Sequence, residues 1–441
     1  MKKNDERKAL NDRVWQELLL FKKTDYHAAI NEHLFTLVDQ RFSGNPLRAF
    51  FVDQMYAYLK ENKAIRKGKR LPKAIFHTKL PFIFELIISI QYLHNQVLDQ
   101  KAGVQTTTAI NANLLNANLL KDLLYQYIDQ SFDAKTAKII RRYVLKTFQV
   151  VDLGQCIEKE WNTYDCFIHN NDIPAHPLPE PIEQLIEIDR LEPFLRLLER
   201  SIPKNRWDYT ALYLKRIYLT CASLFVLATK LLIELTGASE RIGQQAIQFS
   251  VCYGMMRQII NDNADVIPSQ LELTTRSKLS EDAFSDVKNK NITLPVLLHL
   301  VEQPHCTAFS HALQLGHQAW EPQQEPVLFD TLVESHALFK SIQFSKVLAA
   351  MCEQALSGQG KSKAHLLATC SIVHWNKFLY PCLKNSAYKK FKKTSFYKHI
   401  KRHIAQLNSN QQLVNAPHQE VAWSFSFFKK IPAFFYHKNS I

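Results

Sequence analysis

A run of oxygen-bearing side chains from Gln258 to Asp265 is the first candidate for chemistry in this sequence. If the run is helical, Asn261 and Asp265 lie four residues apart on one face, with Asp262 close by. Mg²⁺ prefers oxygen ligands in such arrangements and often shares them with substrate phosphates. The same residue types also cap helix ends, so the run by itself leaves a metal site and a simple cap both open.

A second stretch, Phe284 to Val296, follows the first and contains Asp286, Lys290 and the tripeptide Thr293-Leu294-Pro295. Together the two stretches resemble the second aspartate-rich motif of the trans-isoprenyl diphosphate synthase (polyprenyl synthetase) family, Q-x-x-D-D-x-x-D followed by D-x-x-x-(G)-K-x-T-L-P. The resemblance implies an all-α, class I terpenoid synthase-like helical bundle around a central cavity. It also implies a prenyl diphosphate substrate and Mg²⁺ as cofactor.

Other family motifs occur in the expected order. The segment Lys67 to Pro72 is similar to G-G-K-R-x-R-P, which implies that Lys69 and Arg70 bind a diphosphate through charge-assisted hydrogen bonds. Gly154 to Glu158 resembles G-Q-x-x-D, and Leu219 to Phe225 resembles K-T-A-x-L-F. The resemblance covers roughly residues 40 to 370.

The departures from the family pattern concern charge. The first aspartate-rich motif corresponds to Glu85 through Asp99, where two of three aspartates are replaced by amides, one of them Asn95. Fewer carboxylates predict weaker binding of a hard cation. The lysine of K-T is Leu219, although Lys215 lies one turn earlier. In the second motif the first aspartate is Asn261, and the late lysine is shifted to Lys290.

The resemblance implies a set of site residues, and we expect the two aspartate-rich helices to face each other across one cavity. The predicted metal ligands are Asn95, Asp99, Asn261, Asp262 and Asp265, and the predicted catalytic residues are Asp262, Asp265 and Thr220. The predicted diphosphate-binding residues are Lys69, Arg70, Lys101, Lys215, Gln258, Asp286 and Lys290. The predicted cavity residues are Phe84, Tyr92, Gln155 and Phe249.

Three functions remain open at this point. The first is a divergent prenyltransferase that ionises an allylic diphosphate and joins the prenyl group to isopentenyl diphosphate or another acceptor. The second is a terpene cyclase acting on a single prenyl diphosphate. The third is a catalytically inactive regulatory or scaffold subunit, which amide substitutions in a metal site also indicate. The sequence does not determine chain length, product, stereochemistry or acceptor, and a homodimer is one possible assembly.

Composition and apolar periodicity favour helices throughout. The chain has 441 residues with only 10 glycines, and apolar residues recur at three- and four-residue intervals. We expect an N-terminal helical segment at 1–40, a synthase-like domain at 41–375 with a Pro-rich loop at 172–181, and an extension at 376–441. The longest apolar candidate, Leu80 to Leu93, is interrupted by His94, so no spanning helix is expected. The N-terminus lacks a secretory pattern, which predicts a cytoplasmic protein.

The extension is basic and aromatic. Eight basic residues and no acid lie between Lys384 and Arg402, interleaved with Tyr388, Phe391, Phe396 and Tyr397. A further ring cluster runs from Trp423 to Tyr436. Such a mixture suits the surface of an anionic membrane. The alternative is a solvated basic helix whose rings dock on their own domain. Nucleic acid fits the net charge of +14, but no supporting motif occurs, so no nucleic-acid partner is expected.

Overall fold

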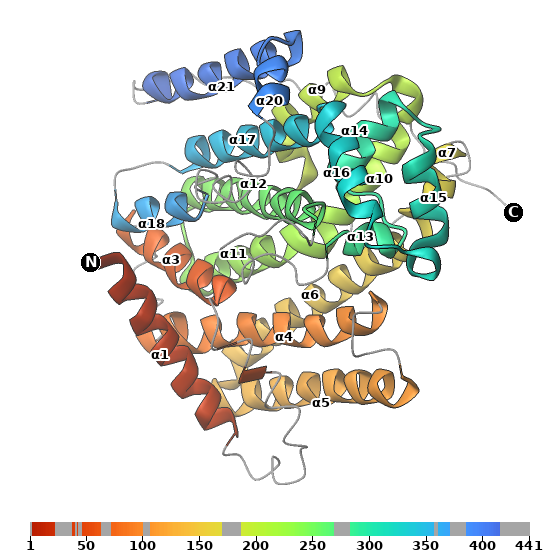
Figure 1. Cartoon of the computed structure of the whole chain (residues 1–441). Coiled ribbons are helices and arrows are strands. Elements are labelled where there is room, and N and C mark those ends of the chain that lie inside the picture. The colour runs from red at the N-terminus through yellow and green to blue at the C-terminus, as the bar shows by residue number, and fades with distance from the viewer. Residues whose placement is uncertain are drawn as a thin grey trace, which may run out of the picture. The chain divides into compact units, whose positions relative to one another are not determined.

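All the regular secondary structure in the described residues is helical. The computed structural model describes residues 2–22, 38–39, 42, 46–62, 72–99, 106–169, 187–268, 283–356, 360–370 and 385–414, and no strand occurs among them (Figure 1). The all-α fold class predicted from the apolar periodicity is therefore confirmed. The Pro-rich loop at 172–181 and the ring cluster from Trp423 onward lie outside the described residues.

The chain forms two compact units, each built from separated segments. Unit 1 comprises 1–149, 224–250 and 356–370, and unit 2 comprises 150–223, 251–355 and 371–441. The helices α6 (Ala134–Trp161) and α12 (Glu240–Asp265) contribute to both. The linear division at residues 40 and 375 follows changes in composition and remains a proposal beside this division by contacts.

Unit 1 is built on the apolar helix α4. Its main helices are α1 (Lys2–Lys22), α3 (Leu47–Glu61), α4 (Leu80–Leu98), α5 (Thr107–Ser131), α11 (Ser223–Thr236) and α18 (Lys361–Thr369). A π-helical turn, η2 (Ile75–Lys79), leads into α4, which packs against α3 and α5. Pro81 has no N–H to donate within this continuous helical run, and the carbonyl oxygen of His77, four residues earlier, accepts a hydrogen bond from Arg13 Nε (3.1 Å) instead. The Thr106 hydroxyl accepts a hydrogen bond from Ala109 N (3.2 Å) and so caps α5.

Unit 2 contains the remaining helices. They are α7 (Tyr164–Ile168), η4 (Ile188–Leu191), α9 (Glu192–Ser201), η5 (Lys204–Arg206), α10 (Trp207–Ile217), η6 (Tyr218–Ala222), α13 (Ser285–Lys288), α14 (Leu294–Glu302), α15 (Thr307–Leu315), η8 (Gly316–Ala319), α16 (Gln324–Glu334), α17 (Ala337–Ala355), α20 (Asn385–Phe391) and α21 (Ser395–Val414). Helix α17 is the centre of one layer, because α14, α16 and α21 all contact it.

Helix α6 and the π-helical turn η6 approach each other closely at Gly154. A Cβ atom at this position would lie 2.8 Å from Leu219 Cβ and 2.8 Å from Thr220 Cγ2. Only glycine allows the two backbones to come so near. The crossing is antiparallel, so residues one turn beyond Gly154 on α6 face residues one turn before Thr220, and this register positions the site.

Among the described residues, the helix that is long and apolar enough to cross a membrane is not the one that the sequence analysis singled out. The continuous helical stretch Lys204–Thr236 contains an 18-residue window with a mean hydropathy of 1.7 and is long enough to cross a membrane, whereas Leu80–Leu93 was the expected candidate. Small polar residues such as Thr220 and Ser223 interrupt the apolar residues of this stretch, so it does not look like one apolar run. They lower its mean hydropathy only slightly. In the structure 72% of the window is buried, as a core helix would be.

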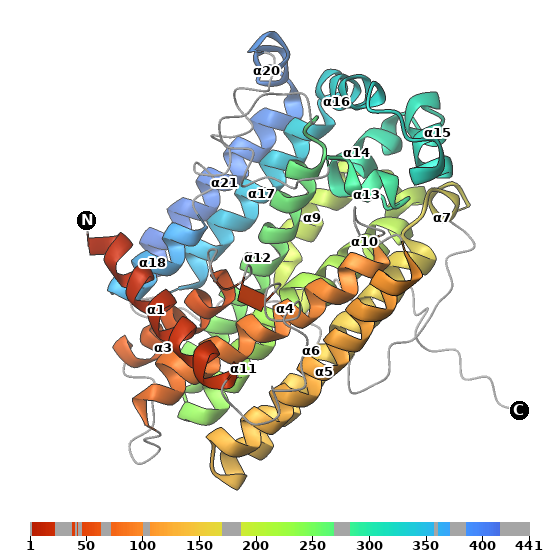
Figure 2. The same cartoon turned by 60° about the horizontal axis from the view of Figure 1, so that its bottom comes forward.

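The described part of the basic extension packs on unit 2. Helix α21 lies along α17 in both views (Figures 1 and 2). The rings of Phe391 and Phe396 contact Phe339 (5.3 Å) and Phe344 (5.6 Å) on α17, and Phe391 is fully buried. The described basic residues are exposed, namely Lys389, Lys390, Lys392, Lys393, Lys398, Lys401 and Arg402. The rings therefore face the protein and the charges face the solvent. For these two helices, this arrangement matches the alternative in which the rings dock on their own domain.

Candidate functional site

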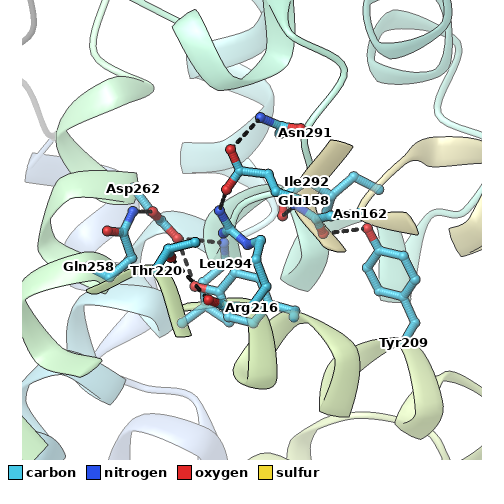
Figure 3. Close-up of polar contacts among 11 residues, drawn as sticks. Glu158, Asn162, Tyr209, Arg216, Thr220, Gln258, Asp262, Asn291, Ile292 and Leu294 are labelled. Carbon is cyan, nitrogen blue, oxygen red and sulfur yellow. Dashed lines mark hydrogen bonds and ion pairs between the residues drawn. The ribbon is translucent and has the colours of Figure 1, made fainter. Parts of the chain in front are cut away.

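Asp262, near the C-terminal end of α12, is a fully buried carboxylate with hydrogen bonds to both oxygens (Figure 3). Its Oδ2 accepts from the Tyr213 hydroxyl (2.7 Å) on α10 and from Leu294 N (3.4 Å), and Gln258 Nε2 donates to its Oδ1 (2.9 Å). These donors compensate for the lost water. Burial nevertheless raises the pKa of Asp262, and Arg216 opposes this shift. The side chain thus connects α10, α12 and the start of α14.

Asp265, one turn further on, is 5% exposed and anchors the next segment. Its carboxylate accepts hydrogen bonds from Ser285 N (2.9 Å) and Asp286 N (3.2 Å), the first two amides of α13. Negative charge at a helix N-terminus is favourable there. Burial and the neighbouring charge of Asp286 raise the pKa of Asp265 well above its ordinary value. Asp265 thus holds the start of α13 through two backbone amides, and its role as a metal ligand stays a prediction.

The segment 283–294, here called the motif loop, is held to α6 and α12 along its length. Asn291 Nδ2 donates to a Glu158 oxygen (3.3 Å). Asn162 binds Ile292 in both directions, through Ile292 N to Asn162 O (3.4 Å) and through Asn162 Nδ2 to Ile292 O (3.2 Å). At the end of the segment, the Leu294 amide donates to Asp262 Oδ2. Each of these hydrogen bonds helps to fix the motif loop.

Two residues of the motif loop have left-handed backbone conformations. Phe284 has φ 56° and is buried, and Lys290 has φ 63° and is exposed. Non-glycine residues adopt this region only when their surroundings hold them there. Gly316 leaves room for the loop, because a Cβ at Gly316 would lie 2.6 Å from the Lys288 carbonyl oxygen and 3.1 Å from the Lys290 side chain. Lys288 itself is buried and pairs with Glu325 (3.7 Å).

Arg216 belongs to the same cluster, although sequence reasoning did not select it. Its guanidinium is ion-paired with Glu158 across the crossing of α6 and α10 (Figure 3). The signal that finds it is the register at Gly154: Glu158 is one turn after Gly154, and Arg216 is one turn before Thr220. Recognising Gly154 as the contact point between two antiparallel helices would have paired them.

The predicted residues around this crossing have different environments. The Thr220 hydroxyl donates to the carbonyl oxygen of Arg216 in its own helix (3.0 Å). Lys215 and Gln155 are half-buried. Asn261 is exposed, although it precedes the buried Asp262 directly. Asp286 is half-buried and lies in the first turn of α13.

The residues predicted in the first motif lie in unit 1. Asn95 and Asp99 are half-buried at the C-terminal end of α4, where Asp99 N donates to Asn95 O (2.9 Å). Phe84 and Phe249 are buried in the packed core, and Phe249 stacks with Phe51 at 6.3 Å. Tyr92 is half-buried. Their roles in lining a cavity, and the expected facing of the two motifs, stay predictions.

Three predicted diphosphate ligands, Lys69, Arg70 and Lys101, lie outside the described residues. Within the described ranges, no group of three or more His, Cys, Asp or Glu side chains is arranged to hold a metal ion. Both carboxylate oxygens of Asp262 and of Asp265 accept hydrogen bonds from the protein, and their role as Mg²⁺ ligands stays a prediction. Of the other predicted metal ligands, Asn261 is exposed, and Asn95 and Asp99 are half-buried.

Comparison with solved structures identifies the class of fold. The chain is similar to a polyprenyl synthase of Caulobacter crescentus CB15, crystallised with calcium and isoprenyl diphosphate, at TM-score 0.58 and 14% identity over 85% of this chain and 95% of the other. A geranylgeranyl pyrophosphate synthase of Lactobacillus brevis ATCC 367 gives 0.57 and 14% over 84% and 95%. A heptaprenyl diphosphate synthase of Staphylococcus aureus gives 0.54 and 18% over 83% and 96%. The protein has the all-helical fold of the polyprenyl synthases.

One characterised relative is also detected from sequence. It is heptaprenyl diphosphate synthase component 2 of Bacillus subtilis (strain 168), 27% identical over 169 residues. That match covers 38% of this chain and 45% of the relative, so it spans less than half of the relative's length. No family model matches the chain.

Proposed function

We propose that the protein is a divergent isoprenoid synthase, which binds an allylic prenyl diphosphate and transfers the prenyl group to isopentenyl diphosphate or another acceptor. The observation that carries this proposal is the motif loop. Within a polyprenyl-synthase fold, buried acids of the second motif hold the segment that carries Asp286 and Lys290. Buried ionisable groups with shifted pKa values are concentrated at functional sites.

The proposed chemistry divides the motif residues into two groups. Asp262 and Asp265 position the loop, whereas the exposed ammonium of Lys290 donates to phosphate oxygens. Gln258 supports Asp262 through its hydrogen bond. Asn261 on α12, and Asn95 and Asp99 on α4, remain the proposed oxygen donors for Mg²⁺. When bound, that ion would supply polarisation of the diphosphate leaving group.

The test is incubation of the purified full chain with Mg²⁺ and farnesyl or geranylgeranyl diphosphate, with and without isopentenyl diphosphate. A longer prenyl diphosphate formed only with the second substrate supports the transferase. A hydrocarbon or alcohol formed without it overturns the transferase in favour of the cyclase. Heat-treated protein and a reaction with excess chelator serve as controls.

A non-catalytic subunit is the second candidate, and a specific observation favours it. The exposed ligand position of the second motif carries an amide, Asn261, and the retained carboxylates are occupied by protein donors. Charge neutralisation dominates binding of hard cations, so such a site binds Mg²⁺ weakly. The Bacillus relative is named as a synthase component. Absence of turnover in the assay above, in a protein that is folded by circular dichroism, would support this candidate, and turnover by the purified chain alone would contradict it.

We propose further that the exposed basic residues of α20 and α21 attract an anionic membrane surface. The rings of these helices are turned inward, so attachment would rest on charge at about 1 kcal/mol per basic residue near the surface. Lys398→Glu with Lys401→Glu should reduce co-sedimentation with phosphatidylserine vesicles at low salt. The control pair Lys135→Glu with Lys138→Glu, exposed on α6, should not. A cytoplasmic location and a homodimer also remain proposals, the latter checked by light scattering.

A further inference from the structure

The guanidinium of Arg216 is buried with an incomplete set of partners. Its side chain is 2% exposed, and Nη1 forms the ion pair with Glu158. Its Nε and Nη2 atoms are buried without a hydrogen-bond partner. Burial acts to lower the pKa of Arg216, but Glu158 and Asp262 raise it by more, so the group stays charged. A buried cation with two unsatisfied nitrogens is a costly feature for a core.

Two routes lead from Arg216 to the motif loop. On one side it holds Glu158, whose other oxygen accepts the hydrogen bond from Asn291. On the other side it lies over the ring of Tyr213 at 5.2 Å. The Tyr213 hydroxyl donates to Asp262, and the Asp262 carboxylate accepts the Leu294 amide. The cation therefore stands between the groups that fix the two ends of the segment Asn291 to Leu294.

We propose that Arg216 is a positioning residue, which fixes the motif loop through Glu158 and through Tyr213 with Asp262, so that Asp286 and Lys290 are held for ligand binding. The part that concerns ligand binding rests on the proposed function. The part that concerns the loop stands on the contacts alone. Arg216 supplies the fixed cation here, whereas Lys215, the cation expected from the sequence, is half-buried at the neighbouring position and points elsewhere on the helix.

Stability alone does not account for this arrangement. A buried ion pair is often replaceable by apolar side chains of similar volume without loss of stability, whereas removing one partner leaves an uncompensated charge. Glu158 divides its two oxygens between Arg216 Nη1 and Asn291 Nδ2, so this carboxylate joins the cation to the motif loop. A role in fixing the loop explains why a charged group occupies this buried position.

The first experiment measures amide hydrogen exchange of the full chain by mass spectrometry. Arg216→Met should raise the exchange rate of amides in 289–294 at least about tenfold, because both routes to the loop lose their cation, while amides of α21 stay unchanged. Arg216→Lys, which keeps the charge but not the fork, should fall between Met and wild type. The matched control is Arg196→Met, since Arg196 pairs with Glu192 on the exposed face of α9. Loop exchange within twofold of wild type in a folded Arg216→Met protein overturns the proposal.

The charge-keeping variant separates positioning from plain structural support. Partial rescue of loop protection in Arg216→Lys supports the role of the cation, and exchange as fast in Arg216→Lys as in Arg216→Met overturns it. If Arg216→Met does not fold, Glu158→Gln removes the same ion pair with no change of shape and should loosen Asn291 and Ile292. Unchanged exchange in Glu158→Gln then contradicts the proposal.

The third readout uses inorganic pyrophosphate, titrated calorimetrically with Mg²⁺ present. Arg216→Met should weaken its binding at least about tenfold and Arg216→Lys less, with no effect of Arg196→Met. Equal affinity in wild type and Arg216→Met would overturn the link between Arg216 and the ligand. If wild-type protein does not bind pyrophosphate, the proposed function fails, while the exchange results still decide whether Arg216 positions the loop.

Discussion

The C-terminal ends of α4 and α12 carry the two aspartate-rich motifs, and the two ends differ in which positions are charged and which are buried. At the end of α4 the positions are half-buried, and Asn95 is an amide where Asp99 is a carboxylate. At the end of α12 the exposed position, Asn261, is an amide, and the buried positions, Asp262 and Asp265, are carboxylates. In the second motif, carboxylates are kept where backbone amides and a tyrosine hydroxyl donate to them.

This difference separates two reasons for finding an acid in a motif. A buried acid with several protein donors is explained by the loop that it fixes, whether or not a metal binds. An exposed acid or amide next to it is explained by a ligand that binds from the solvent, such as a metal ion or a diphosphate. The motif positions that report on ligand chemistry are therefore Asn261, Asn95 and Asp99, and the following experiments set them against Asp262 and Asp265.

The largest effect is expected for Asp265→Ala. The substitution leaves the half-buried amides of Ser285 and Asp286 without an acceptor, which should lower the free energy of unfolding by about 2–4 kcal/mol. Asp99→Ala, at a half-buried helix end, should cost less than about 1 kcal/mol. Urea denaturation followed by circular dichroism measures both. Comparable losses of unfolding free energy in the two variants would show that Asp99 and Asp265 have similar structural roles. Prenyl transfer, where present, should be lost in Asp265→Ala and in Asp262→Ala because the loop is released.

The next largest effect concerns the helix crossing that creates the cluster. Gly154→Ala places a methyl group 2.8 Å from Leu219 Cβ and should destabilise the protein by about 1–3 kcal/mol. Gly243→Ala is the matched control on a helix, because its Cβ would meet only the flexible end of Ile233 at 3.3 Å. There the gain in helix propensity, up to about 1 kcal/mol, should offset the contact. The two thermal midpoints should therefore differ clearly, and equal shifts would contradict the close approach at Gly154.

The third effect is a change in pH dependence. Because the pKa of Asp265 is raised in the folded state, the folded protein binds more protons than the unfolded chain above the ordinary carboxyl pKa of 3.8, and stability falls as pH rises through this window. Asp286→Asn removes one cause of the raised pKa. It should flatten this fall and stabilise the protein at pH 7 by on the order of 1 kcal/mol. Glu199→Gln, an exposed acid on α9, should leave the slope unchanged.

The smallest effect is expected for metal affinity. Asn95→Asp and Asn261→Asp each add a carboxylate at an accessible position, and carboxylate number tunes affinity for hard cations. Each should tighten Mg²⁺ binding roughly threefold in calorimetric titration. Asn118→Asp, exposed on α5, controls for the change in net charge. If Asn95→Asp leaves the affinity unchanged while Asn261→Asp raises it, only the end of α12 meets the metal.

The sequence predicted the helices and the motif positions, but not which of these positions are buried. Helical period located the ends of α4 and α12. The burial of Asp262 was also accessible in principle, because Ile259 and Val266 lie three and four residues away on its face. The role of Arg216 was not, since it depends on pairing with Glu158, 58 residues earlier, through a crossing set by Gly154. The spacing of the rings in the extension fits either a membrane surface or docking on the protein. Only the observed contacts of Phe391 and Phe396 with α17 distinguish these two alternatives.

The docking of α20 and α21 on α17 has a consequence for synthesis of the chain. Phe339 and Phe344 leave the ribosome about 50 residues before their partners Phe391 and Phe396, since ring pairs such as Phe339 and Phe391 are 52 positions apart. At about 5–20 residues per second, this aromatic face waits for several seconds without its cover. Transiently exposed apolar surface of this kind is prone to aggregation and is what chaperones cover. The yield of folded protein should therefore depend on the rate of translation through the codons from Phe339 to Phe396.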